Sequence, residues 1–501
     1  MVDDRLLTKA STNPENHDRL EQLNIDRLEL NRLLLQSADK VPERSKRIEQ
    51  LEEEIERLEG QLARQISGFE RTRAALSVTV AQVQACLPTD AALIEYFLYW
   101  RYLGKSKFEP AYGALVLLPK GEPCWIPLDN AGKINKLVSR YSRLRRLNGS
   151  EAGEGDVSKN LRCLYDAIWA AVSPHLSGDT KQLIVSPDGQ LNFISVATLL
   201  TPDDRFLGEN YQVQYVASGR DLLQEQKQTA AREVVLFTAP DFDANLATHP
   251  APKDAEAKMR GTETRGLQDL QFQKLEGFQN ENEQLLRLFS AWHWPTQSHS
   301  GPNATKTALI EVRSPFILHL ATHGFFESLG PSDTGSRALS KPSIFESKFF
   351  NNPMHQSGLA LAGANVTLKL WNRGQEAPSD DGILTAEDAG TMDLQGTWLV
   401  TLAACDTAKG QERIGEGVMG LRRGFTKAGV KNLLMTLWEV ADQTTTQIMT
   451  DFYQAAHKSG NVPQALAEVQ RDWLVKLRNE KGLPDAVNLA GPFIMSSQGK
   501  P

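Results

Sequence analysis

The sequence has few cysteines, no long apolar run and no excess of basic residues, and each absence excludes a class of protein. Its four cysteines stand far apart without a CxxC pair, which argues against a zinc knuckle and a disulfide framework. The longest apolar runs, such as 167–172, are far shorter than the roughly 20 residues that span a bilayer, and the first residues lack the features of a signal peptide. The net charge of −7 gives no positive field that would attract nucleic acid or an anionic membrane. We therefore expect a cytoplasmic protein with free thiols that binds neither.

The remaining composition is that of an ordinary folded chain. Of 501 residues, 41% are hydrophobic and 23% are charged, which excludes wholesale disorder. At about 150 residues per domain this length corresponds to three domains. We predict a helical arm over 1–88, a first α/β unit over 89–240 and a second α/β unit over 241–501.

The predicted arm has a seven-residue apolar period. The period favours a long helix with a coiled-coil-like stripe, and a shorter helix over 20–35 could fold back on it as a hairpin. Two interpretations stay open: an arm that packs on the next domain, or a surface for a partner or an upstream sensor. The stripe consists of Ile48, Ile55, Leu62, Phe69, Leu76 and Val83.

Beyond residue 88, short apolar runs alternate with helical patterns. Such alternation predicts a mostly parallel, doubly wound sheet in each α/β unit. Residues 240–274 are polar and read as a linker or a long loop, and 326–356 read as a loop insertion. The predicted strands are 92–99, 112–118, 124–128, 182–186, 211–217 and 233–239 in the first unit, and 316–320, 358–362, 398–404 and 432–438 in the second.

Two of these strands end on residues that can carry chemistry. In the run 318–326, the predicted strand is followed by His323 and Gly324, and in the run 398–407 the predicted strand is followed by Cys405. In open α/β sheets, sites form at the carboxyl ends of strands. If the two strands are neighbours, the histidine and the cysteine meet there.

A cysteine beside a histidine can form a nucleophilic dyad. The imidazole favours the thiolate, and the backbone N–H groups of Gly324 and Cys405 could hold an oxyanion. The pattern alone also allows a buried structural cysteine, which is the commoner case. His319, two positions before Ala321 on the same strand, is read as a hydrogen-bonded core histidine that could help to orient His323.

Four short motifs, in this order, resemble the CHAT proteases, which are caspase-like cysteine peptidases related to separases and often fused to TPR repeats. The motifs are HLATHG at 319–324, AACDT at 403–407, GEG at 415–417 and TLW at 436–438. The resemblance implies a caspase–haemoglobinase fold in which a first, inactive caspase-like unit precedes an active one. It also implies that His323 is the general base and Cys405 the nucleophile, with no metal or organic cofactor. Here a helical arm stands in place of the usual TPR repeats.

The resemblance extends to the S1 pocket, where relatives that cleave after basic residues place a carboxylate. Asp442, and less so Glu439, follow the strand 432–438 at the same sheet edge and are candidates to pair with a P1 Lys or Arg. Asp442 is equally suited to be the N-cap of the following helix. Asp406 could be a pocket wall or a turn residue.

Three functions compete. The first is a cysteine endopeptidase that an activating protein partner switches on through the helical arm and the loops 326–356 and 406–415, in a bacterial-type defence or signalling pathway. The second is a catalytically silent signalling scaffold that uses the same fold to bind proteins. The third, a nucleotide-dependent oxidoreductase, rests on a GxGxxG match at 415–420. Its first glycine does not directly follow the strand, as a dinucleotide fingerprint requires, so we discount it.

Overall fold

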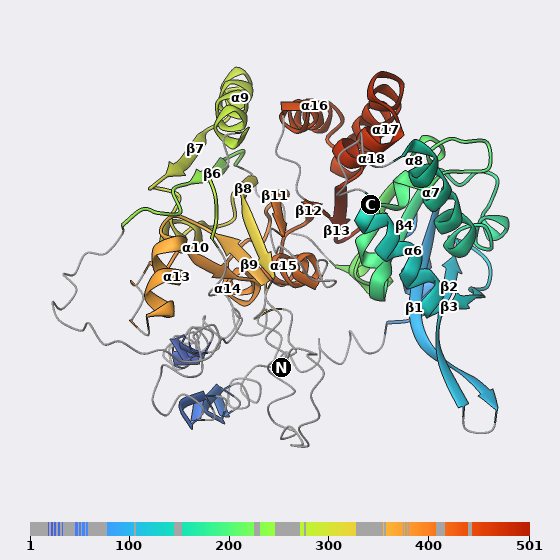
Figure 1. The fold of residues 1–501 in the computed structure, drawn as a ribbon, viewed down its shortest axis with the longest axis horizontal. Helices are drawn as coiled ribbons and strands as arrows, with labels where there is room; N and C mark the ends of the chain where they lie inside the picture. The colour runs from blue at the N-terminus through green and yellow to red at the C-terminus, as the bar shows by residue number, and fades with distance from the viewer. Residues whose placement is uncertain are drawn as a thin grey trace.

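The computed structural model describes most of the chain after residue 77 (Figure 1). The described residues are scattered positions between 19 and 58, then 78–104, 107–144, 153–224, 231–245, 271–274, 277–326, 354, 357–373, 375, 378, 380–406, 416–438 and 443–500.

The strands form one mixed sheet in two series (Figure 1). In the first series, β1, β4 and β5 run parallel, whereas β1, β2 and β3 pair antiparallel. The first three strands therefore depart from the mostly parallel sheet that we expected. The bounds are β1 (Ala91–Gly104), β2 (Lys107–Leu117), β3 (Cys124–Asn130), β4 (Gln182–Ser186) and β5 (Gln212–Tyr215).

The second series is parallel at its centre and antiparallel at its margins. The parallel strands are β7, β6, β8, β11 and β12 in spatial order, while β9, β10 and β13 pair antiparallel with their neighbours, except where β13 meets β5. β6, expected at the end of the first unit, pairs here with β7 and β8. The bounds are β6 (Val234–Pro240), β7 (Thr296–Gly301), β8 (Ile317–Phe326), β9 (Ser357–Ala360), β10 (Ile383–Thr385), β11 (Leu399–Asp406), β12 (Asn432–Thr436) and β13 (Phe493–Ser497).

Helices flank both series. In the view of Figure 1, α9 and α16 lie above the second series and α13, α14 and α15 lie below it. None of the described helices is long and apolar enough to cross a membrane. The bounds are α5 (Val80–Gln84), α6 (Ala131–Leu144), α7 (Glu154–Ile168), α8 (Leu207–Asn210), α9 (Gly277–Ala291), α10 (Lys306–Ile310), α13 (Ala364–Asn372), α14 (Ala386–Thr391), α15 (Glu416–Lys427), α16 (Gln443–Ser459), α17 (Val462–Lys481) and α18 (Leu483–Ala490), with 3₁₀ turns η2 (Ser173–His175), η3 (Gly189–Phe193), η4 (Val196–Thr198) and η5 (Gly219–Leu223).

In the predicted arm, the described positions up to residue 58 are helical. Glu29 and Arg47, 18 positions apart, form an ion pair at 2.8 Å, so the two helical stretches touch at this point. The long apolar stripe does not follow one helix to Val83. Val83 belongs to α5, which starts after an extended N-cap at Thr79 with a capping box to Gln82. Leu62, Phe69 and Leu76 lie outside the described residues, and the arm as a unit stays a prediction.

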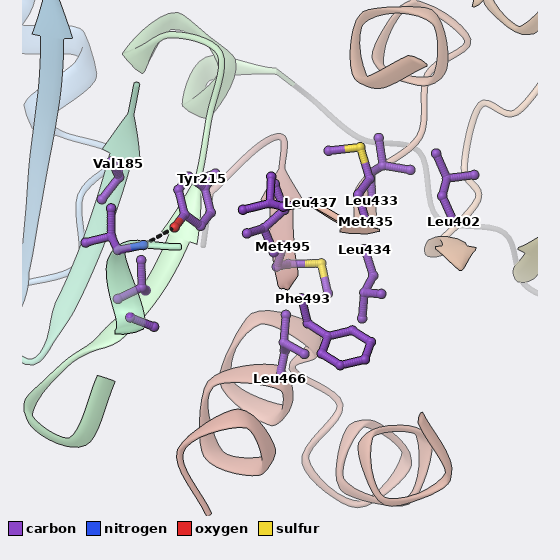
Figure 2. Close-up of a cluster of buried hydrophobic side chains, with 14 of the residues drawn as sticks. Val185, Tyr215, Leu402, Leu433, Leu434, Met435, Leu437, Leu466, Phe493 and Met495 are labelled. Carbon is purple, nitrogen blue, oxygen red and sulfur yellow. Dashed lines mark hydrogen bonds between the residues drawn. The ribbon is translucent and has the colours of Figure 1, made fainter. Parts of the chain in front are cut away.

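The two series join edge to edge through β13. Its Ser496 lies opposite Tyr215 of β5, and one cluster of buried side chains continues across this joint. Figure 2 shows Tyr215 between Val185 of the first series and Met495 of the second, with its hydroxyl accepting a hydrogen bond from the Val196 N–H at 2.9 Å. The sheet and the core are thus continuous, and the division into two tandem units stays a prediction.

A buried guanidinium lies at this joint. Arg422 of α15 is 3% exposed and donates from Nε to Ser496 Oγ at 3.0 Å. Its Nη2 has no hydrogen-bond partner among the described residues. Burial lowers the pKa of Arg422 to about 10, against a weaker opposing attraction from Asp221. The charge therefore costs folding free energy at neutral pH.

We expect Arg422→Met to raise the free energy of unfolding by about 1–2 kcal/mol, because it replaces an incompletely paired buried charge by an apolar chain of similar volume. The folded pKa lies below the ordinary 12.5, so the cost of the charge is fully present below about pH 10 and shrinks as the pH rises further. Urea unfolding at pH 7 measures the gain. Arg423→Met, the same change at the exposed neighbour on α15, should leave stability unchanged. A loss of stability in Arg422→Met would contradict this account.

Candidate active site

The site is built on two neighbouring parallel strands, β8 and β11. Both are mostly apolar, and their described side chains are buried, as in central strands of a sheet covered on both faces. Their register pairs Leu399 with Ile317 and continues without a shift to the pair Cys405 and His323. Paired positions in parallel strands lie side by side on one face, with the strands about 4.8 Å apart. The sheet thus brings together the two residues that the sequence singled out. Gly324 follows His323 and pairs with Asp406 on one side and Leu359 on the other.

The imidazole of His323 is enclosed, with 5% of the residue exposed. Its Nε2 lies 2.8 Å from the backbone carbonyl oxygen of Gln273. A carbonyl can only accept a hydrogen bond, so Nε2 carries the proton in this arrangement. In the neutral ring, Nδ1 is then the nitrogen that can take up a proton.

Two phenylalanines form the walls around this imidazole. The rings of Phe242 and Phe272 lie with centroids 5.3 Å and 5.8 Å from that of His323. Both belong to a buried cluster with Phe325 and Trp371. They come from 240–274, which the sequence presents as a linker or a mobile loop. Phe242 and Phe272 of that stretch instead pack on His323, and nothing in their local pattern marks this long-range contact.

On the same strand, His319 is fully buried in a polar network. Its Nδ1 lies 3.0 Å from the hydroxyl of Tyr453, which in turn lies 2.8 Å from Thr401 Oγ1. Its Nε2 lies 3.4 Å from a carboxylate oxygen of Glu281 on α9. Burial raises the pKa of the Tyr453 hydroxyl, which therefore stays protonated and donates one hydrogen bond while it accepts another. His319 is thus a hydrogen-bonded core residue, separated from His323 by Ala321.

We expect Tyr453→Phe to lower the free energy of unfolding by about 1–3 kcal/mol, because it leaves two buried polar groups, on His319 and Thr401, without this partner. Denaturant unfolding followed by circular dichroism measures the change. Tyr102→Phe, which removes an exposed hydroxyl on β1, is the matched control and should be neutral. Equal stability of the two variants would show that the network contributes nothing to folding.

The proposed S1 residues are only partly described. Asp442 and Glu439 lie outside the described residues, and Asp406 is described as the last backbone position of β11. The first residue of α16 is Gln443, and both interpretations of Asp442 stay predictions. Glu416 and Gly417 begin α15, and Gly415 lies outside the described residues.

The three cysteines whose side chains the structure describes lie away from β8 and β11. Cys86 is buried in an apolar cluster, and none of Cys86, Cys124 and Cys163 is in a disulfide. Cys124 of β3 lies 3.3 Å from Nδ1 of His175, a contact that their spacing in the sequence does not reveal. In the part of the chain that the structure describes, no group of three or more potential ligands could hold a metal ion.

The CHAT domain family matches residues 158–485. The chain belongs to the CHAT domain family. The matched CHAT region begins inside α7 and ends inside α18, so it contains β8 and β11 with both His323 and Cys405, and it excludes β1, β2 and β3.

Among solved structures, the CHAT chain is similar to a chain of the Saccharomyces cerevisiae separase–securin complex at 2.6 Å. The identity is 10%, the match covers 95% of this chain and 27% of that chain, and the TM-score is 0.34. A second structure of that complex, at 3.0 Å, matches with 9% identity over 96% of this chain and 27% of that chain, also with a TM-score of 0.34. The chain thus spans 27% of the length of these relatives. A comparison with curated proteins finds no match.

Proposed function

We propose that this CHAT protein is a cysteine endopeptidase that cleaves protein substrates with a His323–Cys405 dyad. The observation that carries the proposal is the register of β8 and β11, which pairs these two positions at the carboxyl ends of neighbouring parallel strands. Membership of the CHAT family, whose resemblance to caspase-like peptidases implies the same two roles, supports it independently.

In the proposed reaction, the Cys405 thiol transfers its proton to Nδ1 of His323. The thiolate attacks the scissile carbonyl carbon, and the backbone N–H groups of Gly324 and Cys405 stabilise the oxyanion. As the C–N bond breaks, His323 returns the proton to the leaving amine. Water, deprotonated by His323, then hydrolyses the thioester and regenerates the thiol. The residues complete this cycle without a metal or an organic cofactor.

The proposal includes control by a protein partner and a reducing compartment. Because an oxidised Cys405 could not attack a carbonyl, we place the enzyme in the cytoplasm. A partner or sensor that acts through the helical arm, in a defence or signalling pathway, would release the active arrangement. The alternative of a silent scaffold predicts the same partner binding without cleavage.

The dyad is tested with a fluorogenic peptide library. We expect Cys405→Ala and His323→Ala each to lower cleavage by at least about a thousandfold, because nucleophile and base act as a unit. Circular dichroism establishes that both variants keep the fold.

A cysteine–histidine contact elsewhere in the chain supplies matched controls. Cys124→Ala and His175→Ala remove a thiol and an imidazole that lie 3.3 Å apart on β3 and η2. Cleavage by these variants should stay within about twofold of the parent, as for changes away from the reacting atoms. Full function of Cys405→Ala in the cell would favour the scaffold instead.

We propose that Asp442, with Glu439 and Asp406 as weaker candidates, pairs with a basic P1 residue. Asp442→Asn should lower kcat/KM for Lys and Arg at P1 by about 10–100-fold while leaving apolar P1 residues unaffected, because it removes one partner of a charge-assisted contact. Asn caps a helix as well as Asp does, so a pure N-cap role predicts no change in kcat/KM. A parent preference for apolar P1 residues would exclude the assignment.

A further inference from the structure

Asn365 lies in the first turn of α13, beside both walls of His323. The N-cap Gly363 has a φ of +83°, in the left-handed region that glycine adopts at little cost. As a result of this turn, the first residues of α13 lie against the two segments that contain Phe242 and Phe272. The backbone N–H groups of Gly363 and Asn365 donate to the carbonyls of Asp241 at 3.0 Å and Phe242 at 2.9 Å.

The side chain of Asn365, in a residue only 2% exposed, holds the other segment by both of its backbone groups. Its Oδ1 accepts from the Phe272 N–H at 2.9 Å, and its Nδ2 donates to the Phe272 carbonyl at 2.9 Å. Nδ2 also lies 3.3 Å from Asp243 Oδ2. A carboxamide that pairs with an N–H and a C=O of one residue imitates a strand partner and fixes both adjoining peptide planes.

The residue that follows Phe272 carries the carbonyl that meets His323. Gln273 O is the oxygen 2.8 Å from Nε2 of that imidazole. Asn365 thus holds both segments that surround His323, since its side chain fixes the backbone of Phe272, next to Gln273, and its N–H holds Phe242. We propose that Asn365 is a positioning residue that sets the tautomer of His323 through the Gln273 carbonyl, so that Nδ1 is the nitrogen available to Cys405. The inference rests on the proposed function.

The physical effect is on the charged form of the dyad. A carbonyl on Nε2–H stabilises the imidazolium more than the neutral ring, since hydrogen bonds from charged donors are the stronger ones. The imidazolium in turn favours the thiolate. If the Gln273 carbonyl no longer meets Nε2, the pH at which the Cys405 thiolate forms should be higher.

The charged groups next to this contact are few among the described residues. The exposed Lys274 follows Gln273, Asp241 and Asp243 flank Phe242, and Lys369 on α13 pairs with Asp243 at 3.0 Å on the exposed side. Lys369→Ala therefore removes a charge from the same helix and the same aspartate without touching Asn365, and it serves as the matched control.

The test measures the pH dependence of Cys405 alkylation by iodoacetamide, read peptide by peptide by mass spectrometry in the full chain. Asn365→Asp keeps the size of the side chain but replaces the Nδ2 donor by an oxygen that faces the Phe272 carbonyl and Asp243. We expect the alkylation midpoint to rise by about one pH unit and the rate at pH 7 to fall about tenfold. Asn365→Ser, which also loses the paired contact but adds no charge, should shift the midpoint in the same direction. Lys369→Ala should leave the midpoint unchanged.

Cys86 reports on folding in the same experiment. It is buried, so protection of Cys86 in each variant shows that the shift at Cys405 does not come from unfolding. If both Asn365 variants keep the parent midpoint while His323→Ala raises it, the positioning role is wrong and the dyad stands. If His323→Ala also leaves the midpoint at the parent value, the proposed function itself fails.

Discussion

The site depends on the unbroken parallel register between β8 and β11. Because side chains alternate along a strand, a slip of one residue would pair His323 with Ala404 or Asp406 and put the cysteine position on the other face. The register is held on both sides, since β8 also pairs in parallel with β6 and β11 with β12. Apolar side chains buried on both faces make each of these pairings costly to shift. The pairing of positions 323 and 405 is therefore a consequence of the hydrophobic core that fixes the register earlier along the same two strands.

The same strand places two histidines in contrasting surroundings. His319 and His323 share a face of β8, with the small Ala321 between them. His319 lies beneath α9 and α16, where Tyr453 and Glu281 enclose it and no substrate could reach it. His323 lies at the carboxyl end, with the rings of Phe242 and Phe272 beside it and the Gln273 carbonyl at its Nε2. Burial of a polar ring costs free energy unless its nitrogens have partners. His319 Nδ1 is paired with the Tyr453 hydroxyl, whereas His323 Nε2 meets a backbone carbonyl, so the two imidazoles of one strand lie in different polar surroundings.

The features that the sequence predicted best are the strands with a clear apolar run and the residues at the carboxyl ends of those strands. The run 182–186 is β4 with the same ends, and the meeting of His323 with Cys405 followed from two strands that end at one sheet edge. It missed β7, whose residues are mostly polar, and β13, whose place between β12 and β5 depends on partners far away in the chain. Phe242 and Phe272 stand in a polar stretch without a period, so only the folded chain reveals that they enclose His323. The continuous helix expected to reach Val83 failed because the capping box at Thr79 starts a new helix there.

A chain of packed elements links the region beside the arm to the segment that follows Cys405. α5 packs with Leu222 of η5 in one apolar cluster, and the carbonyl of Asp221 in η5 accepts from the Gly499 N–H, just beyond β13, at 2.8 Å. The Asp221 carboxylate attracts Arg422 on α15, whose first turn starts ten positions after the end of β11. Contiguity alone does not couple two sites: an element in the path must have two arrangements that the partner distinguishes. Arg422 is the residue in this path that a second arrangement could stabilise. A shift of α15 that gave Arg422 Nη2 a hydrogen-bond acceptor would offset part of the free-energy cost of burying the guanidinium. If the proposed activating partner acts through the arm, this path leads its effect to α15, which begins eleven positions after Cys405.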